Sequence, residues 1–272
     1  MAKRPKKAPP RILVVLSDIH AGSDVGLCPP EVVLAKGNIV SHGHNAAQVW
    51  LWKQYEAAVE WAAGIVGADE FALLLNGDMT EGTHHRTTEI IAATIEEHSE
   101  IARLALEPFT RLAAQTYVTL GTECHTLECE HRLAHKIGAV GGRARAKQLF
   151  RIAGTLVDAT HHMPVTGRSY LEAGAMSILK GNAIVNAQRA GHQIPRVFLR
   201  GHRHVPGFFA DCDSLVGVTG AWQFLTRHGQ KVVPDSIPRP SILLLDWRGM
   251  PDDSLPSVHQ FCPRPPQPDI HE

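Results

Sequence analysis

Four short apolar runs in this chain are each followed closely by side chains that bind metal ions. Consecutive β-branched and aliphatic residues are typical of a strand that is buried on both faces. The runs cover residues 12–16, 71–75, 155–157 and 197–199, and the residues that follow them include Asp18, His20, Asp78, His161, His162, His202 and His204. Parallel strands deliver their last residues to one edge of a sheet, where ligands bind in α/β folds. The sequence therefore predicts carboxylates and imidazoles gathered at one edge.

The spacing within these segments suits metal binding. Asp18 and His20 are two residues apart, and so are His202 and His204. In a strand this spacing puts both side chains on the same side, so that one ion can contact both. Each pair alone has a plainer explanation, a turn-capping Asp or an incidental histidine, and the segment ending in Asp78 is ordinary turn chemistry. Their joint occurrence after buried strands favours a site for two divalent ions, a common device for phosphoryl transfer.

Composition limits the class of protein. The 272 residues, 44% of them hydrophobic, suit one large α/β domain or two small ones. The net charge is +0, so no whole-molecule field favours a polyanionic partner. Five cysteines without regular spacing argue against a disulfide framework and favour reduced thiols in the cytoplasm. No stretch approaches the roughly 20 apolar residues of a membrane span, and no secretory signal is recognisable, so we expect a cytoplasmic protein without a membrane partner.

We expect a disordered basic tail over 1–10, a single domain over 11–262 and a C-terminal tail over 263–272. The basic tail is either a solvated segment or an arm that contacts a phosphate backbone. Periodicity predicts helices over 46–66, 87–114, 128–136 and 171–189, and further strands over 117–120, 208–210, 214–219 and 242–247. The last three strands are expected to form a second, antiparallel sheet. These elements predict an α/β fold with helices outside two packed sheets.

With these motifs the chain resembles the calcineurin-like metallophosphoesterase superfamily, and more loosely a bacterial and phage branch of it. The resemblance covers roughly residues 11–220 and rests on Asp18-x-His20, Gly77-Asp78, a strand-end segment at Gly121, His161-His162 and Gly201-His202-x-His204. It implies a four-layer α/β/β/α sandwich with two mixed sheets. It also implies ligand roles: Asp18, His20 and His204 on a first ion, Asp78 bridging, and His202 with His161, or alternatively His162, on a second.

The third block departs from the family pattern. The family has Gly-Asn-His, with Asn as a ligand and His assisting the leaving group, whereas this chain has Gly121-Thr122-Glu123-Cys124-His125. We expect Glu123, an oxygen donor suited to Mn²⁺, Mg²⁺ or Fe, to replace the amide ligand. His125 is then the catalytic histidine that protonates the leaving group. Two alternatives stay open: Cys124 as a soft ligand that favours Zn²⁺, or a block that no longer supports catalysis.

The resemblance implies a metal-dependent phosphoric ester hydrolase in which metal-bound water attacks the phosphoester. We expect two divalent ions, Mn before Fe, Zn or Mg. The favoured activity is that of a phosphodiesterase or nuclease, with DNA or RNA as the substrate. The alternatives are a phosphomonoesterase or protein phosphatase with the same site, and a catalytically weakened scaffold that binds metal and nucleic acid. The sequence does not indicate the oligomeric state.

Overall fold

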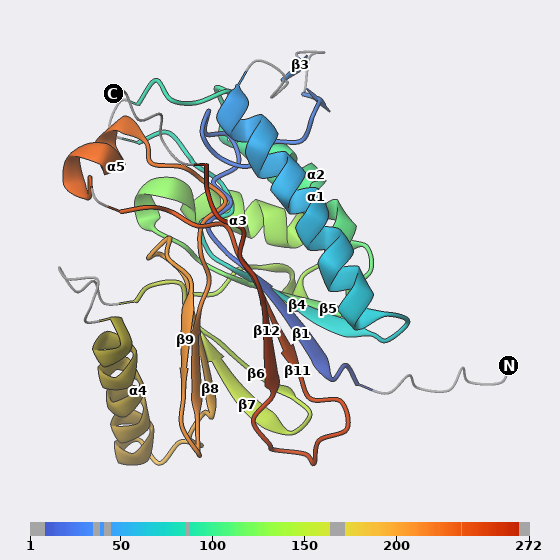
Figure 1. Cartoon of the computed structure of the whole chain (residues 1–272), viewed down its shortest axis with the longest axis vertical. Coiled ribbons are helices and arrows are strands. Elements are labelled where there is room, and N and C mark those ends of the chain that lie inside the picture. The colour runs from blue at the N-terminus through green and yellow to red at the C-terminus, as the bar shows by residue number, and fades with distance from the viewer. Residues whose placement is uncertain are drawn as a thin grey trace, which may run out of the picture.

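Two five-stranded sheets form the centre of the computed structural model, which describes residues 9–34, 39–40, 45–84, 87–163, 172–234 and 236–266 (Figure 1). The first sheet has the order β12-β11-β1-β4-β5 and the second the order β6-β7-β8-β10-β9. The first contains β1 (Ile12–Leu16), β4 (Phe71–Asn76), β5 (Gln115–Thr119), β11 (Ile242–Asp246) and β12 (Ser257–Phe261). The second contains β6 (Gln148–Ile152), β7 (Thr155–Ala159), β8 (Val197–Arg200), β9 (Gly207–Ala210) and β10 (Leu215–Val218). Most of the predicted tails at 1–10 and 263–272 lies outside the described residues.

Both sheets are mixed, as the family resemblance implied. β1, β4 and β5 run parallel, and so do β7, β8 and β10, while the remaining strands pair antiparallel. The prediction of a purely antiparallel second sheet is wrong in two respects, because β10 is parallel to β8 and β11 belongs to the first sheet. The apolar run of β11 is buried, and it pairs with β1 at the centre of the first sheet. A short hairpin of β2 (Val32–Val33) and β3 (Ile39–Val40) is separate.

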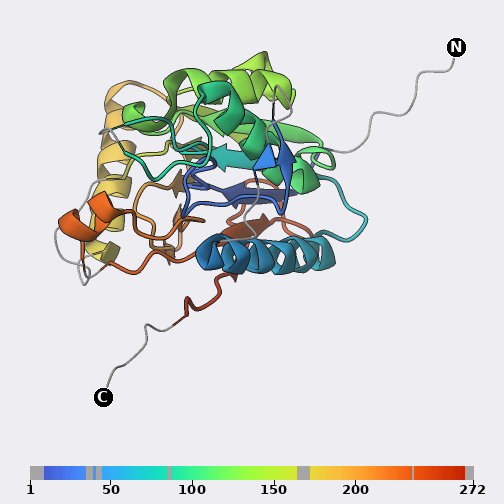
Figure 2. The same cartoon turned by 90° about the horizontal axis from the view of Figure 1, so that it is seen from above.

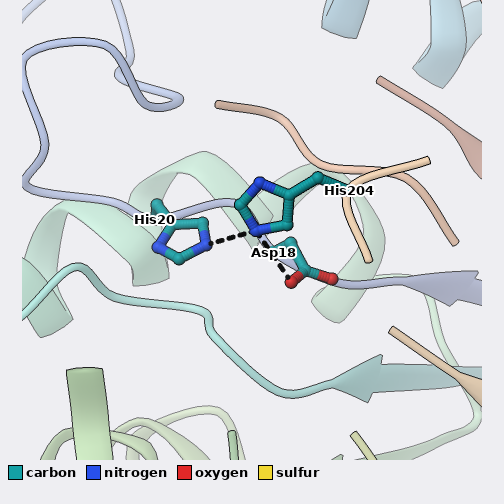
Figure 3. A group of neighbouring side chains, drawn as sticks. All are labelled: Asp18, His20 and His204. Carbon is teal, nitrogen blue, oxygen red and sulfur yellow. Dashed lines mark hydrogen bonds and ion pairs between the residues drawn. The ribbon is translucent and has the colours of Figure 1, made fainter. Parts of the chain in front are cut away.

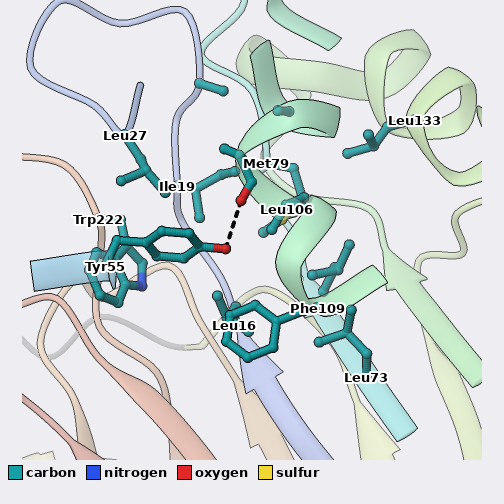
Figure 4. Close-up of a cluster of buried hydrophobic side chains, with 14 of the residues drawn as sticks. Leu16, Ile19, Leu27, Tyr55, Leu73, Met79, Leu106, Phe109, Leu133 and Trp222 are labelled. Atoms are coloured by element: carbon teal, nitrogen blue, oxygen red, sulfur yellow. Dashed lines mark hydrogen bonds between the residues drawn. The ribbon is translucent and has the colours of Figure 1, made fainter. Parts of the chain in front are cut away.

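Alternation along the strands builds four layers. On β1, Ile12, Val14 and Leu16 pack with the helices, whereas Leu13 and Val15 face the second sheet. Helices α1 (Ala46–Val66) and α2 (Ile95–Thr110) cover the first sheet, and α4 (Glu172–Arg189) covers the second (Figures 1 and 2). The hydroxyl of Tyr55 on α1 donates to the carbonyl of Ala105 on α2 at 2.8 Å inside the helix-side core (Figure 4). This arrangement confirms the predicted two packed mixed sheets flanked by helices.

Local signals set the helix ends. Asn45 caps α1 by accepting from the backbone N–H groups of residues 47 and 48, and Gly67 ends the helix, as predicted. The predicted start of α2 at residue 87 is wrong, because Thr94 and Glu97 form a capping box that begins the helix at Ile95. Helix α3 (Glu123–Lys136) begins five residues earlier than predicted, and α5 (Arg227–Val232) is an additional short helix. In the described part of the chain, no helix has the length and apolar character needed to cross a membrane.

Candidate metal centre

The loops that follow β1, β4, β7 and β8 meet at the carboxyl ends of these parallel strands, where the two sheets lie side by side. Backbone hydrogen bonds connect the loops within each sheet: Asp18 N–H donates to Gly77 O at 3.0 Å, and Gly201 N–H donates to His161 O at 2.9 Å. The two sheets are joined where the backbone N–H of His202 donates to the Asp18 carboxylate, 3.1 Å from Oδ1. The predicted convergence therefore takes place between two sheets rather than along one.

Asp18, His20 and His204 form the first group of converging ligand atoms (Figure 3). His204 Nε2 lies 3.4 Å from Asp18 Oδ1 and 3.3 Å from His20 Nε2. Two imidazole nitrogens that face each other beside a carboxylate can share a proton or a cation. The ligand atoms lie within 4.8 Å of one another, a spacing that one ion can contract into a coordination shell. This triad matches the set expected for the first ion.

Asp78, His161 and His202 form the second group. His161 is buried; its Nδ1–H donates to the Asn76 carbonyl at 2.7 Å, which directs Nε2 toward Asp78 Oδ2 at 2.9 Å. A backbone carbonyl on the far ring nitrogen is one of the usual partners of a metal-binding histidine. His162, the alternative ligand, is exposed, with its ring 4.8 Å from that of His202. The geometry therefore favours His161, as expected from its place after the strand.

Asp18 lies at the boundary between the two groups. Its Oδ1 is 3.4 Å from His204 Nε2 in the first group and 3.8 Å from His161 Nε2 in the second. Asp78, which the family resemblance makes the bridging carboxylate, belongs to the second group alone among the described residues. The bridging role of Asp78 stays a prediction, and Asp18 is a second candidate for it.

Five of the six residues in these two groups have left-handed backbone conformations. The φ angles are 53° at Asp18, 45° at His20, 53° at Asp78, 69° at His202 and 58° at His204. Such a conformation costs a non-glycine residue about 1–2 kcal/mol. Strained residues of this kind cluster at functional sites, where the surrounding structure enforces them. The strained residues are the candidate ligands themselves, which indicates that the folded state tolerates this loss of stability because the conformation directs their side chains toward the centre.

Two glycines allow the close approach of the loops. A Cβ at Gly121 would lie 2.1 Å from Asp78 Oδ1, and one at Gly77 would lie 2.5 Å from the His161 ring. Gly77 also has a φ of 82°. Any larger residue at either position would push a candidate ligand out of the centre. The glycines of the sequence motifs thus serve the packing of the ligands.

The electrostatics of the centre favour a cation. Burial opposes ionisation of Asp18 and Asp78, but the charge of His161, together with hydrogen bonds and charges from other nearby histidines, lowers the pKa of both carboxyls. Burial also opposes protonation of His161, yet Asp78 and Asp18 raise its pKa to about 10. Burial and the charge of His161 lower the pKa of His202 to about 4. In the metal-free protein a proton on His161 compensates two buried carboxylates, and a bound cation would serve the same purpose.

The third block places Thr122, rather than Glu123, beside the second group. The Thr122 hydroxyl lies 3.1 Å from Asp78 Oδ2 and 3.2 Å from His202 Nδ1. Glu123, the expected replacement ligand, is exposed at the first position of α3 and joins none of the ligand groups found among the described residues. Cys124, the alternative, is exposed too and joins none of these groups either.

His125 lies on the side of the first group, in a third cluster with His20 and Glu81. Its Nδ1–H donates to the backbone carbonyl of Glu81 at 2.8 Å, and its ring centroid is 4.8 Å from that of His20. Burial and the charge of His20 lower the pKa of His125. The predicted catalytic histidine is therefore within reach of the centre, with Nε2 as its remaining nitrogen.

Three residues that the sequence did not single out contribute to the centre. Thr122 contacts the second group, and Glu81 accepts from His20 Nδ1 at 2.9 Å. Glu130 on α3 accepts the backbone N–H groups of Met79 at 3.2 Å and Gly121 at 2.6 Å, which links the loops after β4 and β5. The one sequence signal for Glu81 is its position three residues after Asp78, and none marks Glu130.

The donor set fits divalent transition metals. The two groups together offer four imidazoles and two carboxylates. Imidazole suits Zn, Fe and related ions, whereas carboxylate suits Mg and Mn, so a mixed nitrogen and oxygen set accepts Mn, Fe or Zn more readily than Mg. The described residues therefore include clusters that could bind metal, and the number of ions stays a prediction.

Comparisons with known proteins give structural neighbours alone. No protein-family model matches the chain, and no curated protein matches it. Among solved structures, the chain is similar to a novel archaeal phosphodiesterase, with 14% identity, a TM-score of 0.45 and coverage of 92% of this chain and 99% of that one. Wild-type Vps29 from Entamoeba histolytica complexed with Zn²⁺ gives 11% identity, a TM-score of 0.43 and coverage of 92% and 98%. A predicted phosphoesterase from Streptococcus pneumoniae gives 11% identity, a TM-score of 0.37 and coverage of 93% of this chain and 98% of that one.

Proposed function

We propose that this protein is a dinuclear, metal-dependent phosphodiesterase of the calcineurin-like metallophosphoesterase superfamily. The observation that carries the proposal is the meeting of two ligand triads where the loops of the two sheets converge, with Asp18 Oδ1 of the first triad 3.8 Å from His161 Nε2 of the second. Left-handed strain at five of the six positions supports a functional origin for the cluster.

The residues divide the work between holding metal and moving a proton. Asp18, His20 and His204 would hold one ion, and Asp78, His161 and His202 the other. Two such ions, when bound, supply charge stabilisation for a phosphoryl group and activate water. Thr122 orients Asp78 through its backbone N–H at 2.7 Å. His125 would hold the proton that the leaving oxygen needs, at Nε2, because its Nδ1–H is directed to the Glu81 carbonyl.

The test begins with metal-free protein reloaded with Mn²⁺. We expect two bound ions by elemental analysis and hydrolysis of bis-p-nitrophenyl phosphate in preference to the mono-ester. His202→Ala should lose one ion and most of the activity, whereas His192→Ala, at an exposed position after α4, should keep both. A labelled single DNA or RNA strand then tests the nuclease form of the proposal.

Other outcomes select the alternatives. Preference for the mono-ester would replace the phosphodiesterase with a phosphomonoesterase or protein phosphatase that uses the same residues. Two bound ions without hydrolysis of any phosphoester would favour the metal-binding scaffold. Failure to bind a divalent ion would refute the proposal as a whole.

A further inference from the structure

Glu81 is a buried carboxylate that collects three side-chain donors beside the first ligand group. It is 1% exposed. Its Oε2 accepts from His20 Nδ1 at 2.9 Å and from Gln223 Nε2 at 2.7 Å, and its Oε1 accepts from His84 Nε2 at 2.8 Å. An ionised carboxylate is an acceptor only, so the hydrogen in each contact belongs to the partner.

The contact with His20 decides which of its two nitrogens carries the proton. A neutral imidazole that donates from Nδ1 has its lone pair on Nε2. His20 Nε2 is the atom that faces His204 Nε2, 3.3 Å away, and through it the Asp18 carboxylate. Without an acceptor at Nδ1, the His20 ring is free to rotate or to place its proton on Nε2, and either change withdraws a ligand atom from the first group.

We propose that Glu81 is a positioning residue that keeps His20 Nε2 available to a divalent cation and so sets the metal affinity of the first group. The inference rests on the metal-binding part of the proposed function and not on its catalytic part. The second group has different supports: His161 Nδ1–H donates to Asn76 O at 2.7 Å, and Asp78 accepts from Thr122 N–H at 2.7 Å. Loss of Glu81 should therefore affect one ion and spare the other.

A competing arrangement makes Glu81 itself a ligand. Glu81, His20 and His125 offer ligand atoms within 4.8 Å of one another. In the structure, however, His125 Nδ1–H is engaged by the Glu81 carbonyl at 2.8 Å, and His20 Nδ1 is engaged by the carboxylate. A cation held by these two Nδ1 atoms would have to displace both protons, and His20 would have to bind through both nitrogens to serve the first group as well.

The experiment titrates Mn²⁺ into the metal-free full-length protein by calorimetry. We expect Glu81→Ala to lower the affinity for one of the two ions by about 10- to 100-fold and to leave the affinity for the other unchanged. A loss of this size is usual when the partner of a metal-binding histidine is removed. Glu81→Gln should give a smaller loss, because its amide oxygen still accepts from His20. Glu89→Gln is the matched control, since that carboxylate accepts from the Arg227 backbone without contacting a candidate ligand. Burial lowers the pKa of His20 but Glu81 raises it above its usual value, so the ¹⁵N shifts of its ring are recorded in the metal-free protein at alkaline pH, where the ring is neutral. They should show the Nδ1–H form in the wild type and a mixture of forms in Glu81→Ala.

The possible results separate the two claims. If the wild type binds no divalent ion, the proposed function and this inference fall together. Two outcomes overturn this inference alone, provided that the wild type binds two ions. In the first, Glu81→Ala binds both ions with unchanged affinity. In the second, Glu81→Ala loses both ions and its melting temperature falls. If the wild type binds a third ion that Glu81→Gln does not bind, the inference is overturned too, in favour of Glu81 as a ligand. If Glu81→Ala does not fold, Glu81→Gln and its His20 shifts decide.

Discussion

Thr122 holds the Asp78 carboxylate by two hydrogen bonds, from its backbone N–H to Oδ1 at 2.7 Å and from its hydroxyl to Oδ2 at 3.1 Å. The same hydroxyl lies 3.2 Å from His202 Nδ1. Thr122 is thus a link between two members of the second ligand group that lie far apart in the sequence.

We expect Thr122→Val to weaken the second ion by about tenfold. Valine keeps the shape of the side chain and the backbone hydrogen bond to Asp78, but its side chain cannot hydrogen-bond to the carboxylate or to the imidazole of His202. Thr122→Ser, which retains the hydroxyl, is the control. Calorimetric Mn²⁺ titration checks the prediction, and equal affinities in the valine and serine variants would contradict it.

Glu123→Gln should change neither metal content nor turnover. Glu123 is exposed at the start of α3, so its charge is in contact with solvent. Metal analysis and kcat measured beside the wild type test this expectation. A lost ion would restore the interpretation that the sequence alone suggested, in which Glu123 replaces the amide ligand of the family.

The different fates of Glu123 and His161 show what the sequence could supply. A buried strand fixes the position of the residue that follows it, so the apolar run before His161 predicted its place correctly. The third block lies in a loop, where no hydrophobic period sets the register, and Glu123 at the first position of α3 is exposed and joins none of the ligand groups found among the described residues. Thr122 was beside Glu123 in the sequence, but a hydroxyl without a distinctive spacing gives no signal.

Long-range pairing was the second limit. The run at 242–247 was recognised as a strand, but its partner, β1, lies more than two hundred residues earlier, and local pattern could not assign it to the first sheet. β12 was missed because its side chains are partly exposed and lack a strong apolar run. Glu130 was missed for a related reason: its importance comes from backbone groups of Met79 and Gly121 that only the folded chain brings to it.

Glu130 should make the stability of the metal-free protein depend on pH. Burial, and then the charge of Asp78, raise the pKa of Glu130 to about 7 from 4.5, despite two backbone hydrogen bonds that favour the ionised form. The folded state therefore binds this proton more tightly than the unfolded chain does. The resulting stability is fully present below pH 4.5 and is lost as the pH rises through about 7.

Glu130→Gln removes this dependence, because an amide does not ionise. Between pH 4.5 and about 7, the wild type should lose about 3 kcal/mol of unfolding free energy relative to the variant. Urea unfolding at several pH values in the presence of a chelator measures it. Parallel pH curves for the two proteins would contradict the prediction.

Metal binding should release a proton from His161. Burial disfavours the charged imidazole, but Asp78 and Asp18 raise the pKa of His161 to about 10, so its ring is protonated at neutral pH in the metal-free protein. An ion that takes Nε2 must displace that proton, and its affinity should increase as the pH rises toward about 10. Calorimetry at pH near neutrality, in buffers of different ionisation enthalpy, should show about one more proton released by the wild type than by His161→Gln. Equal proton release would mean that His161 is not a ligand.

His125→Ala should leave both ions bound and slow hydrolysis according to the leaving group. The His125 ring lies 4.8 Å from that of His20, with Nδ1–H fixed on the Glu81 carbonyl, so Nε2 is the atom that can deliver a proton. Esters with an alkoxide leaving group need that proton and should slow by about 10²- to 10⁴-fold. Esters of p-nitrophenol, whose anion leaves without one, should slow much less.

Burial and His20 lower the pKa of His125, so the wild-type advantage should be greatest on the acidic side of its activity profile. His131→Ala, exposed on the same helix, is the control. An equal loss for both classes of ester, with an ion missing, would make His125 a ligand; with both ions present, it would make His125 a substrate-binding group.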